Sequence, residues 1–254
     1  MSALEGSPIQ IPKAATVVAS RIRRNIARGE LQPGDPLPNE TELMALYDVS
    51  RPVIREALRI LESESLLSIK RGAGGGARFQ MPDITVAARH TAMLLQLEGV
   101  ALSDLFEARS MLEPYAVRRL AEQHDPEVIA RLRALHDREL ELVDDFVGYP
   151  MHAASFHRNL VELAGNRTLA VLSRLLITIV EAQNRLTFQG LDDRAAHDVA
   201  SGASEWHGKL IDLIEAGDAD GAEAHWREHL DNAARTALGQ LGPATVVDLL
   251  DPHS

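Results

Sequence analysis

Two arginines at the start of a short amphipathic stretch are well suited to read DNA. Within residues 40–62, ETELMALYDVSRPVIREALRILE, Arg51 and Arg55 are four positions apart and project from one side of a helix. Leu58 points away from that side. A guanidinium can form two hydrogen bonds with a guanine edge or can bind a phosphate. This spacing predicts a DNA-recognition helix, and an amphipathic helical hairpin with a solvated basic face is the alternative interpretation.

A shorter helix and a tight turn must position this recognition helix. The turn Tyr-Asp-Val-Ser separates it from a helix over 40–46, in which Leu43 and Leu46 are expected on one face. Ser50 stands where an N-cap side chain accepts an amide hydrogen. Pro52 lies in the first turn of the second helix, where the missing N–H costs nothing. The two helices therefore predict a helix-turn-helix.

The flanking segments extend this motif. A helix is predicted over 14–28, and two strands are predicted over 66–70 and 77–80. The glycine-rich loop between the strands looks like a phosphate cradle, but no helix start or Lys-Ser/Thr pair follows it. We interpret it as a flexible wing tip that lets Arg71 and Gly72 approach the minor groove or a phosphate. The order helix, helix, recognition helix, hairpin is that of a winged helix-turn-helix.

Charge divides the 254-residue chain into two halves of different character. The net charge is −11, but residues 1–80 carry 11 Lys and Arg against 9 Asp and Glu, whereas residues 81–254 carry 15 against 28. A basic module joined to an acidic domain is a usual feature of DNA-binding regulators. All ten histidines lie at or beyond His90, which raises the question of a metal in the second half. No cysteine is present, so disulfides and thiolate chemistry are excluded.

The second half is predicted to be an antiparallel all-α bundle, so the fold class is mainly α. Its expected helices cover 84–98, 101–122, 126–146, 150–164, 167–188, 192–216 and 219–239. The predicted domain limits are a mobile N-terminus over 1–12, the winged domain over 13–80, a linker over 81–83, the helical domain over 84–240 and a tail over 241–254. No run of 18 apolar residues and no signal-peptide core occur, so we expect a cytoplasmic protein without membrane contact.

The first half resembles the GntR family of bacterial transcription regulators. The stretch GELQPGDPLPNETELMALYDVSRPVIREALRILE matches the family pattern at most of its fixed positions, and the resemblance covers about residues 14–79. Ser65 departs from the glycine that the family usually has before the wing. The resemblance implies binding to double-stranded DNA. The residues predicted to contact DNA are Thr41, Ser50, Arg51, Pro52, Arg55, Arg71 and Gly72.

The second half resembles FCD, the ligand-sensing domain of the FadR subfamily of GntR regulators. The resemblance lies in LFEARSMLEPYAVRRLA, ASFHRNLVELAGN and EWHGKLIDLIEAGDADGAEAHWREHL. It implies that His157, His207 and His229 bind a divalent metal together with an aspartate four residues before the first histidine. Neutral imidazoles that converge from separate helices suit Zn(II) or Ni(II). His207 and His229 flank a turn midway between them, so they are expected to lie opposite each other in a helical hairpin.

One ligand of the family pattern is missing. Position 153 is alanine, and a methyl group cannot bind a metal. His152 is a poor substitute, because five helical residues place it about 140° round from His157. His225, one turn before His229, is expected to pack or to face solvent. A weak three-histidine metal site and a metal-free pocket, as in the acyl-CoA-binding branch of the subfamily, are therefore both open.

A bundle-facing arginine indicates what the cavity binds. Arg109 occupies the position from which FCD domains direct an arginine into the cavity, and a buried guanidinium needs an anionic partner. An effector carboxylate bound through two hydrogen bonds is one candidate, and a salt bridge to Glu113 is the other. The predicted effector-binding residues are Arg109, His157, His207 and His229.

The sequence thus predicts a homodimeric, ligand-responsive regulator rather than an enzyme. We expect a repressor that binds an inverted-repeat operator and is released by a small organic acid or an acyl-CoA-type effector. One rival is a metal-dependent enzyme with a DNA-binding appendage, although three imidazoles without a general base or nucleophile offer little catalytic machinery. Another rival is an architectural DNA-binding protein that senses nothing.

Overall fold

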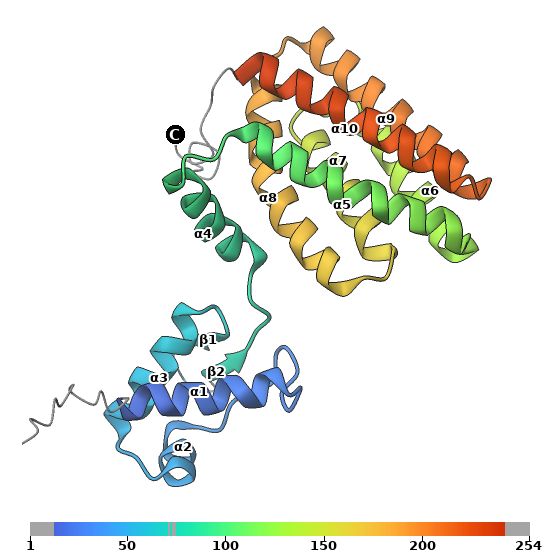
Figure 1. Ribbon diagram of the computed structural model, residues 1–254. Coiled ribbons are helices and arrows are strands. Elements are labelled where there is room, and N and C mark those ends of the chain that lie inside the picture. The colour runs from blue at the N-terminus through green and yellow to red at the C-terminus, as the bar shows by residue number, and fades with distance from the viewer. Residues whose placement is uncertain (1–12, 71, 73–74, 242–254) are drawn as a thin grey trace, which may run out of the picture. The chain divides into compact units, whose positions relative to one another are not determined.

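The computed structural model describes residues 13–70, 72 and 75–241. Its contacts divide the chain into two compact units between Val86 and Ala87. The helices and strands, shown in Figure 1, are α1 (Ala14–Ala27), α2 (Glu40–Tyr47), α3 (Arg51–Ser63), β1 (Leu67–Lys70), β2 (Gly76–Phe79), α4 (Ile84–Leu97), α5 (Leu102–Gln123), α6 (Pro126–Glu141), α7 (Tyr149–Leu163), α8 (Arg167–Gln189), α9 (Asp193–Glu215) and α10 (Ala219–Leu241). The first unit has the expected order of helix-turn-helix and hairpin, and the second is helical.

Local hydrogen bonds fix the limits of α2. The side chain of Asn39 accepts from the amides of Thr41 and Glu42 at 2.9 and 3.0 Å, and the Glu42 carboxylate accepts from the Asn39 amide at 2.8 Å. This reciprocal capping box fixes where the helix begins. At the other end Asp48 adopts a left-handed conformation, with φ 51°, and so ends α2 before α3 begins.

Two expectations about the helix-turn-helix are wrong in detail. Ser50 occupies the N-cap of α3 with an extended backbone, but its side chain makes no capping hydrogen bond. Leu46 does not share the buried face of Leu43, because 65% of it is exposed. The apolar stripe of α2 instead passes from Leu43 to Met44 and Tyr47, which pack against the core of this unit.

The wing is a two-stranded antiparallel hairpin attached to that core. Leu67 pairs with Phe79 in register, and both side chains are buried. Ser65, which precedes the wing, adopts a left-handed backbone with φ 57°. Glycine enters that region without steric cost, whereas serine must be forced into it. The departure from the family glycine therefore falls at a position where glycine has a physical advantage.

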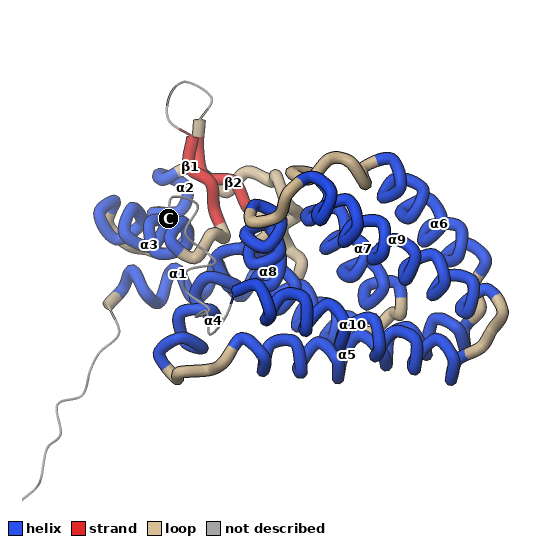
Figure 2. Tube along the Cα trace, turned by 90° about the horizontal axis from the view of Figure 1, so that it is seen from above, coloured by secondary structure: helices blue, strands red, loops and turns tan. Residues whose placement is uncertain are grey.

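In the helical unit, α5 and α10 run side by side (Figures 1 and 2). Pro114 lies inside α5 and has no N–H to give to the carbonyl of Ser110. The Nη1 atom of Arg227, on α10, donates to that carbonyl at 3.0 Å. The residue that interrupts the hydrogen bonding of α5 therefore creates an attachment point for α10.

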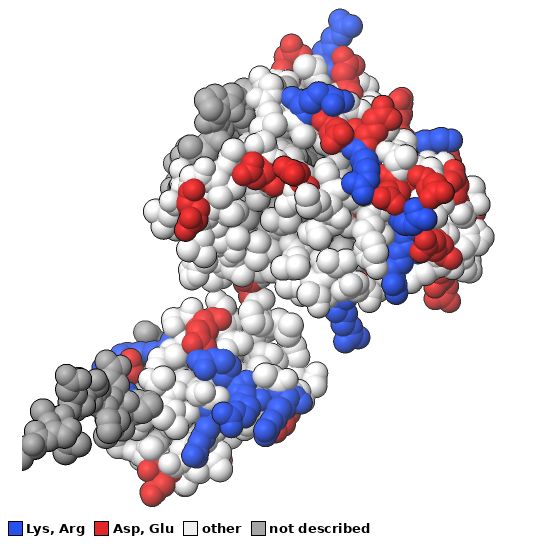
Figure 3. All heavy atoms as spheres, in the orientation of Figure 1, with Lys and Arg blue, Asp and Glu red and all other residues white. Residues whose placement is uncertain are grey.

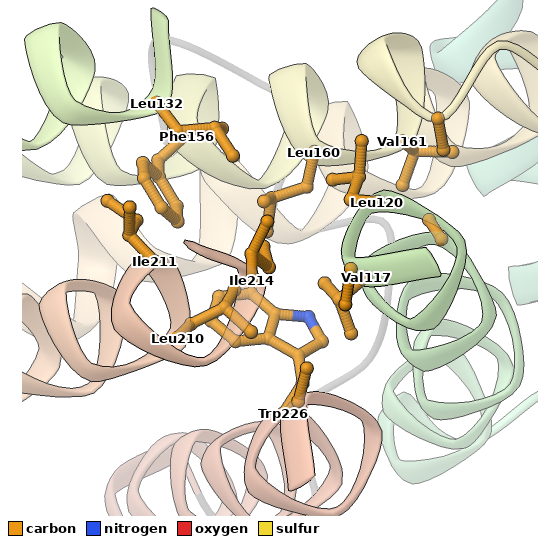
Figure 4. Packing of buried hydrophobic residues seen from close by; sticks show 14 of the residues in the cluster. Val117, Leu120, Leu132, Phe156, Leu160, Val161, Leu210, Ile211, Ile214 and Trp226 are labelled. Atoms are coloured by element: carbon orange, nitrogen blue, oxygen red, sulfur yellow. The ribbon is translucent and has the colours of Figure 1, made fainter. Parts of the chain in front are cut away.

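Trp226 lies at the centre of the core of this unit. It is fully buried, and it projects from α10 among Val117, Leu210 and Ile214 (Figure 4). Its indole nitrogen faces α5, where Nε1 donates to Glu113 at 3.1 Å. The apolar core thus has one polar edge, and the candidate site begins there.

The helix expected over 126–146 is shorter than predicted and ends at Glu141. Beyond this end, the Oδ1 atom of Asp145 accepts from the amides of Val147 and Gly148 at 3.3 and 3.0 Å, and this turn keeps the helix from resuming before α7. A side chain that binds backbone amides locally competes with helical hydrogen bonding. Among the described residues, no helix is both long and apolar enough to cross a membrane.

Candidate functional site

The first N-terminal turns of α3 form an exposed basic surface. The side chains of Arg51 and Arg55 are 54% and 61% exposed, whereas Ile54 and Leu61 are fully buried. Both guanidiniums lie next to Glu40 at the start of α2, with Nε–Oε distances of 3.6 Å for Arg51 and 3.0 Å for Arg55. The carboxylate therefore partly neutralises the two side chains that were predicted to read bases.

The remaining predicted DNA contacts lie around this surface or outside the described residues. Ser50 and Pro52 are exposed at the turn between α2 and α3, and Thr41 is exposed in the first turn of α2, next to Glu40. Gly72 is exposed at the tip of the wing with φ 107°, a conformation that favours glycine. Arg71 lies outside the described residues. Figure 3 shows Lys and Arg side chains gathered over α1 in this unit.

Three buried histidines converge inside the helical unit. His157 comes from α7, His207 from α9 and His229 from α10, and one ring nitrogen of each lies within 4.8 Å of the others. The Nε2 atoms of His207 and His229 are 3.3 Å apart. The turn between α9 and α10 contains Gly217 with φ 69°, which lets the chain reverse and places these two histidines opposite each other.

Two buried glutamates bind the far edges of these rings. Nδ1 of His157 lies 2.6 Å from Oε2 of Glu113, and Nδ1 of His207 lies 2.7 Å from Oε2 of Glu139. Both carboxylates are completely buried. Glu139 is held in turn by the hydroxyl of Tyr149 at 3.1 Å. Two of the three imidazoles are therefore oriented by carboxylates from α5 and α6.

Arg109 lines the cavity, but its charge is already engaged. Its Nε atom donates to Oε1 of Glu113 at 2.6 Å, and its Nη2 atom lies 2.9 Å from Nδ1 of His157. The side chain is only 6% exposed. Of the two partners that the sequence offered for Arg109, the structure shows the salt bridge to Glu113.

The electrostatics of this network favour charged carboxylates and neutral imidazoles at His157 and His229. Burial alone would raise the pKa of Glu113, but Arg109 and His157 outweigh it and lower that pKa to about 2. Burial lowers the pKa of His157 to about 4, despite the neighbouring Glu113, and lowers the pKa of His229 well below its usual value. Neutral imidazole is the form that binds metal ions.

The cluster forms part of the wall of a cavity of about 250 Å³. Its lining is mainly apolar, with Asn232 and Thr236 of α10 and Asp198 of α9 as further polar residues. Ala153 lies in this wall one helical turn before His157. A small polar molecule inside the cavity would therefore contact the three histidines and Arg109. Beside them it would find the methyl group of Ala153 in place of the aspartate of the family pattern.

The other nearby histidines are engaged elsewhere. Nε2 of His152 lies 3.1 Å from the carbonyl oxygen of Leu135, and Nε2 of His225 lies 2.9 Å from that of Trp206. Neither belongs to the converging group. His152 therefore does not replace the missing ligand, as its angle on the helix predicted.

On the surface, Asp144, His197 and Ser201 form a hydrogen-bonded chain in the order of a hydrolase triad. Nδ1 of His197 lies 2.8 Å from Asp144, and its Nε2 atom lies 3.3 Å from the hydroxyl of Ser201. Ser201 is in the interior of α9, where backbone amides are committed to helical hydrogen bonds and cannot form an oxyanion hole. The side chains of His197 and Asp144 are 49% and 84% exposed. The arrangement is a surface hydrogen-bond chain without the rest of a catalytic site.

The sequence analysis missed three residues around the cavity and one on the DNA-binding surface. Glu139 lies seven residues after the buried Leu132, hence two helical turns along the inward stripe of α6, and this spacing could have revealed it. Tyr149 and Trp226 carry no such signal, because aromatic residues at inward positions are usually part of an apolar core. Glu40 was also missed, since an acidic residue in the first turn of a helix is ordinary.

Family models match both units. The model described as "Bacterial regulatory proteins, gntR family" matches residues 14–75, and the model of the FCD domain matches residues 104–232. The HTH-type transcriptional repressor NanR of Salmonella newport (strain SL254) is 29% identical over 245 residues, which cover 93% of this chain and 91% of that protein. NanR of Escherichia coli (strain K12 / DH10B) is equally similar, with 90% of its length covered.

The solved structure of Streptococcus agalactiae GntR shares the fold. It aligns with a TM-score of 0.60 at 23% identity and covers 87% of this chain and 99% of its own. The matched domains are those of transcription regulators and not of enzymes. With a helix-turn-helix in one unit and a histidine-lined cavity in the other, the chain belongs to the GntR family of bacterial regulatory proteins, in the branch with an FCD domain, and is a ligand-responsive DNA-binding transcription regulator.

Proposed function

We propose that this regulator is a homodimeric repressor whose helical unit binds a small organic acid next to a divalent metal ion. The observation that carries the proposal is the convergence of His157, His207 and His229 on a cavity, with two of the rings held by buried glutamates. The similarity to proteins named as transcriptional repressors supports repression as the direction of control.

The three histidines suit a borderline divalent ion such as Zn(II) or Ni(II). Tetrahedral Zn–N bonds of about 2.0–2.1 Å place two ligand nitrogens about 3.4 Å apart. The distance between Nε2 of His207 and Nε2 of His229 is 3.3 Å, close to that value. The donor set is three imidazoles, and Ala153 leaves a coordination position for an external ligand. When bound, the ion supplies positive charge for an anionic effector.

The charge balance supports a metal-dependent acid site. Arg109, Glu113 and Glu139 are all buried at the cluster, so one guanidinium and two carboxylates leave a net charge of −1 from these three side chains. An organic anion would be repelled by this excess, whereas a divalent ion changes its sign. We therefore propose that the acid binds after the metal and that Arg109 shapes the site through Glu113 in addition to lining the cavity.

The volume of the cavity favours a small acid over an acyl-CoA. About 250 Å³ is below the range of roughly 300–1,000 Å³ of most small-molecule pockets. A coenzyme A thioester would require a much larger site than the one described. The effector proposed here is thus a compact carboxylic acid with polar substituents that can reach Asn232 or Thr236.

We also propose that two copies of the chain bind one operator. Each chain carries one recognition helix, and helix-turn-helix dimers read two half-sites about one helical turn apart. The exposed Arg51 and Arg55 would then contact base edges in each half of an inverted repeat. Light scattering of the purified protein, alone and on a selected DNA fragment, measures this stoichiometry.

The central experiment measures metal binding and its effect on acid binding. Protein freed of metal with a chelator is titrated with Zn(II) or Ni(II), and a panel of small hydroxy and keto acids is then tested by calorimetry with and without the ion. His157→Ala, His207→Ala and His229→Ala should each abolish metal binding, whereas His152→Ala should not, because its ring is bonded to Leu135 outside the cluster.

Three results would contradict the proposal or part of it. If the wild-type protein takes up no ion, the histidines are a polar lining of a metal-free pocket. If no acid changes the affinity for DNA in either state, the protein is a DNA-binding protein that senses nothing of this class. A loss of metal in His152→Ala alone would mean that α7 is wrongly placed in the cluster.

A further inference from the structure

The two buried glutamates of the cavity are placed where they cannot themselves be metal ligands. Glu113 and Glu139 contact Nδ1 of His157 and His207 at 2.6 and 2.7 Å. The Nε2 atom lies on the opposite edge of each imidazole ring. Nε2 of His207 faces Nε2 of His229 at 3.3 Å, so the carboxylate at Nδ1 of His207 lies on the side of the ring away from that contact, and the same relation is inferred for Glu113 and His157.

Each carboxylate is fixed by further partners. Glu113 accepts from Nε of Arg109 at 2.6 Å and from Nε1 of Trp226 at 3.1 Å. Glu139 accepts from the hydroxyl of Tyr149 at 3.1 Å. These partners come from three different helices, so neither glutamate can turn towards the cavity without breaking buried hydrogen bonds.

The contacts select one tautomer for each ring. A carboxylate only accepts, so Nδ1 of His207 must carry the hydrogen that it donates to Glu139, and its Nε2 atom keeps a free lone pair. At His157 two contacts compete, since Nδ1 lies 2.6 Å from Glu113 and 2.9 Å from the Arg109 guanidinium. Only the glutamate contact leaves Nε2 of His157 with a free lone pair, as a metal ligand requires. It is also the shorter of the two contacts.

We propose that Glu113 and Glu139 are positioning residues that hold His157 and His207 in the Nδ1–H tautomer and so prepare a three-imidazole site for a borderline divalent ion. This inference rests on the metal site proposed above. Carboxylates that bind the outer nitrogen of a ligating histidine fix the ring and increase its basicity. In this chain the two glutamates also place negative charge next to the histidines. That charge partly replaces the ligand carboxylate that is missing at Ala153.

The donor set also indicates which ions the site prefers. With no protein oxygen at position 153, the ligands that converge from the described part of the chain are nitrogens only. Such a set favours Zn(II), Ni(II) or Co(II) over Mg(II) and Mn(II), which prefer oxygen ligands. The outer carboxylates strengthen this preference, because they act through the imidazoles and leave no hard oxygen facing the ion.

Conservative substitutions test the two glutamates. Glu113→Gln and Glu139→Gln keep the volume of the side chain and remove its charge, and each should weaken Zn(II) or Co(II) affinity by about 10- to 100-fold. Glu181→Gln is a matched control, because Glu181 is a partly buried glutamate of the same unit that pairs with Arg158 at 2.7 Å and is not one of the converging residues. The control should change the affinity by less than about two-fold.

The affinity is measured on the full chain by competition with a chelator, and the thermal unfolding of the metal-free protein is recorded for each variant. The absorption spectrum of bound Co(II) reports ligand geometry and should change in both glutamine variants but not in Glu181→Gln. Equal metal affinity and an unchanged spectrum in well-folded Glu113→Gln and Glu139→Gln would overturn the inference, while the metal site itself would stand. A wild-type protein without metal affinity would instead remove the site on which the inference rests.

A second measurement needs no variant and so does not depend on folding of the mutants. Nitrogen NMR of the imidazoles in the metal-free wild-type protein distinguishes the two neutral tautomers. His157 and His207 should both carry the hydrogen on Nδ1. Finding it on Nε2 in either ring would overturn the role of the corresponding glutamate.

Discussion

Replacing Arg109 by methionine separates the two roles that this arginine can have. Methionine retains much of the length of the side chain but removes the guanidinium that donates to Glu113 at 2.6 Å. Glu113 is fully buried and keeps its contacts with His157 and Trp226. The substitution therefore leaves a buried carboxylate with hydrogen-bond donors but without its fixed positive partner.

The cost of this change can be estimated from the geometry. Breaking one side of a buried ion pair costs about 3–5 kcal/mol. The two remaining donors to Glu113 place the expected loss at the lower end, about 3 kcal/mol. For a unit of this size, 1 kcal/mol corresponds to roughly 2–4 °C in melting temperature, so Arg109→Met should lower it by about 6–12 °C. DNA binding by the first unit should change little.

Circular dichroism melting of the metal-free protein measures the loss, and Arg158→Met is the control. Arg158 pairs with Glu181 at 2.7 Å, but its side chain is 24% exposed, so its removal should cost less than about 1 kcal/mol. If Arg109→Met melts like the wild type and only loses its response to acid, Arg109 is a ligand-binding residue. The stabilising role of its ion pair with Glu113 is then refuted. If melting falls and acid binding to the metal-loaded protein persists, the assignment holds.

Four further predictions concern DNA binding, metal binding and the stability of the DNA-binding unit. Arg51→Ala should weaken operator binding by about 1–3 kcal/mol if the guanidinium contacts a guanine. Arg24→Ala should instead lower, by about one unit and on all sequences, the slope of the logarithm of DNA affinity against the logarithm of salt concentration. Mobility shifts at several salt concentrations distinguish the two effects. Ala153→Asp should strengthen metal binding, because it restores a carboxylate one turn before the first histidine ligand. An unchanged affinity for zinc would refute the placement of residue 153 beside the metal site. Ser65→Gly should raise the melting temperature of the DNA-binding unit by a few degrees, since it relieves a left-handed backbone worth about 1 kcal/mol. Glu40→Gln should raise the affinity for random DNA more than for operator DNA, and an equal rise on both would show that Glu40 has no part in discrimination.

The sequence predicts most helix limits because their signals are local. The expected helices end within a few residues of those observed wherever Gly, Pro or Asp punctuates the pattern. Leu46 was misplaced because a helix of two turns has too few positions to define an apolar stripe. The helix over 126–146 was predicted too long because the turn in which the Asp145 side chain accepts from the amides of Val147 and Gly148 leaves no mark on the apolar pattern.

The site was predictable only in part. The hairpin of α9 and α10 brings His207 and His229 together, as their spacing about a turn suggested. The contact between His207 and Glu139 joins residues 68 positions apart on helices whose packing no local pattern specifies. The choice of Glu113 as the partner of Arg109 depends on burial, because removing both charges from water favours pairing them with each other.

The position of Glu40 has a consequence for how the protein searches a chromosome. In the free protein this carboxylate acts as a built-in counter-ion for Arg51 and Arg55. DNA that binds to these arginines must first displace the Glu40 carboxylate from them. A phosphate offers the arginines only another anion, so the exchange gains little, whereas a guanine edge offers two directed hydrogen bonds. Non-cognate stretches would then be released quickly, and selectivity would arise as much from short residence on wrong sites as from strong contacts on the right one.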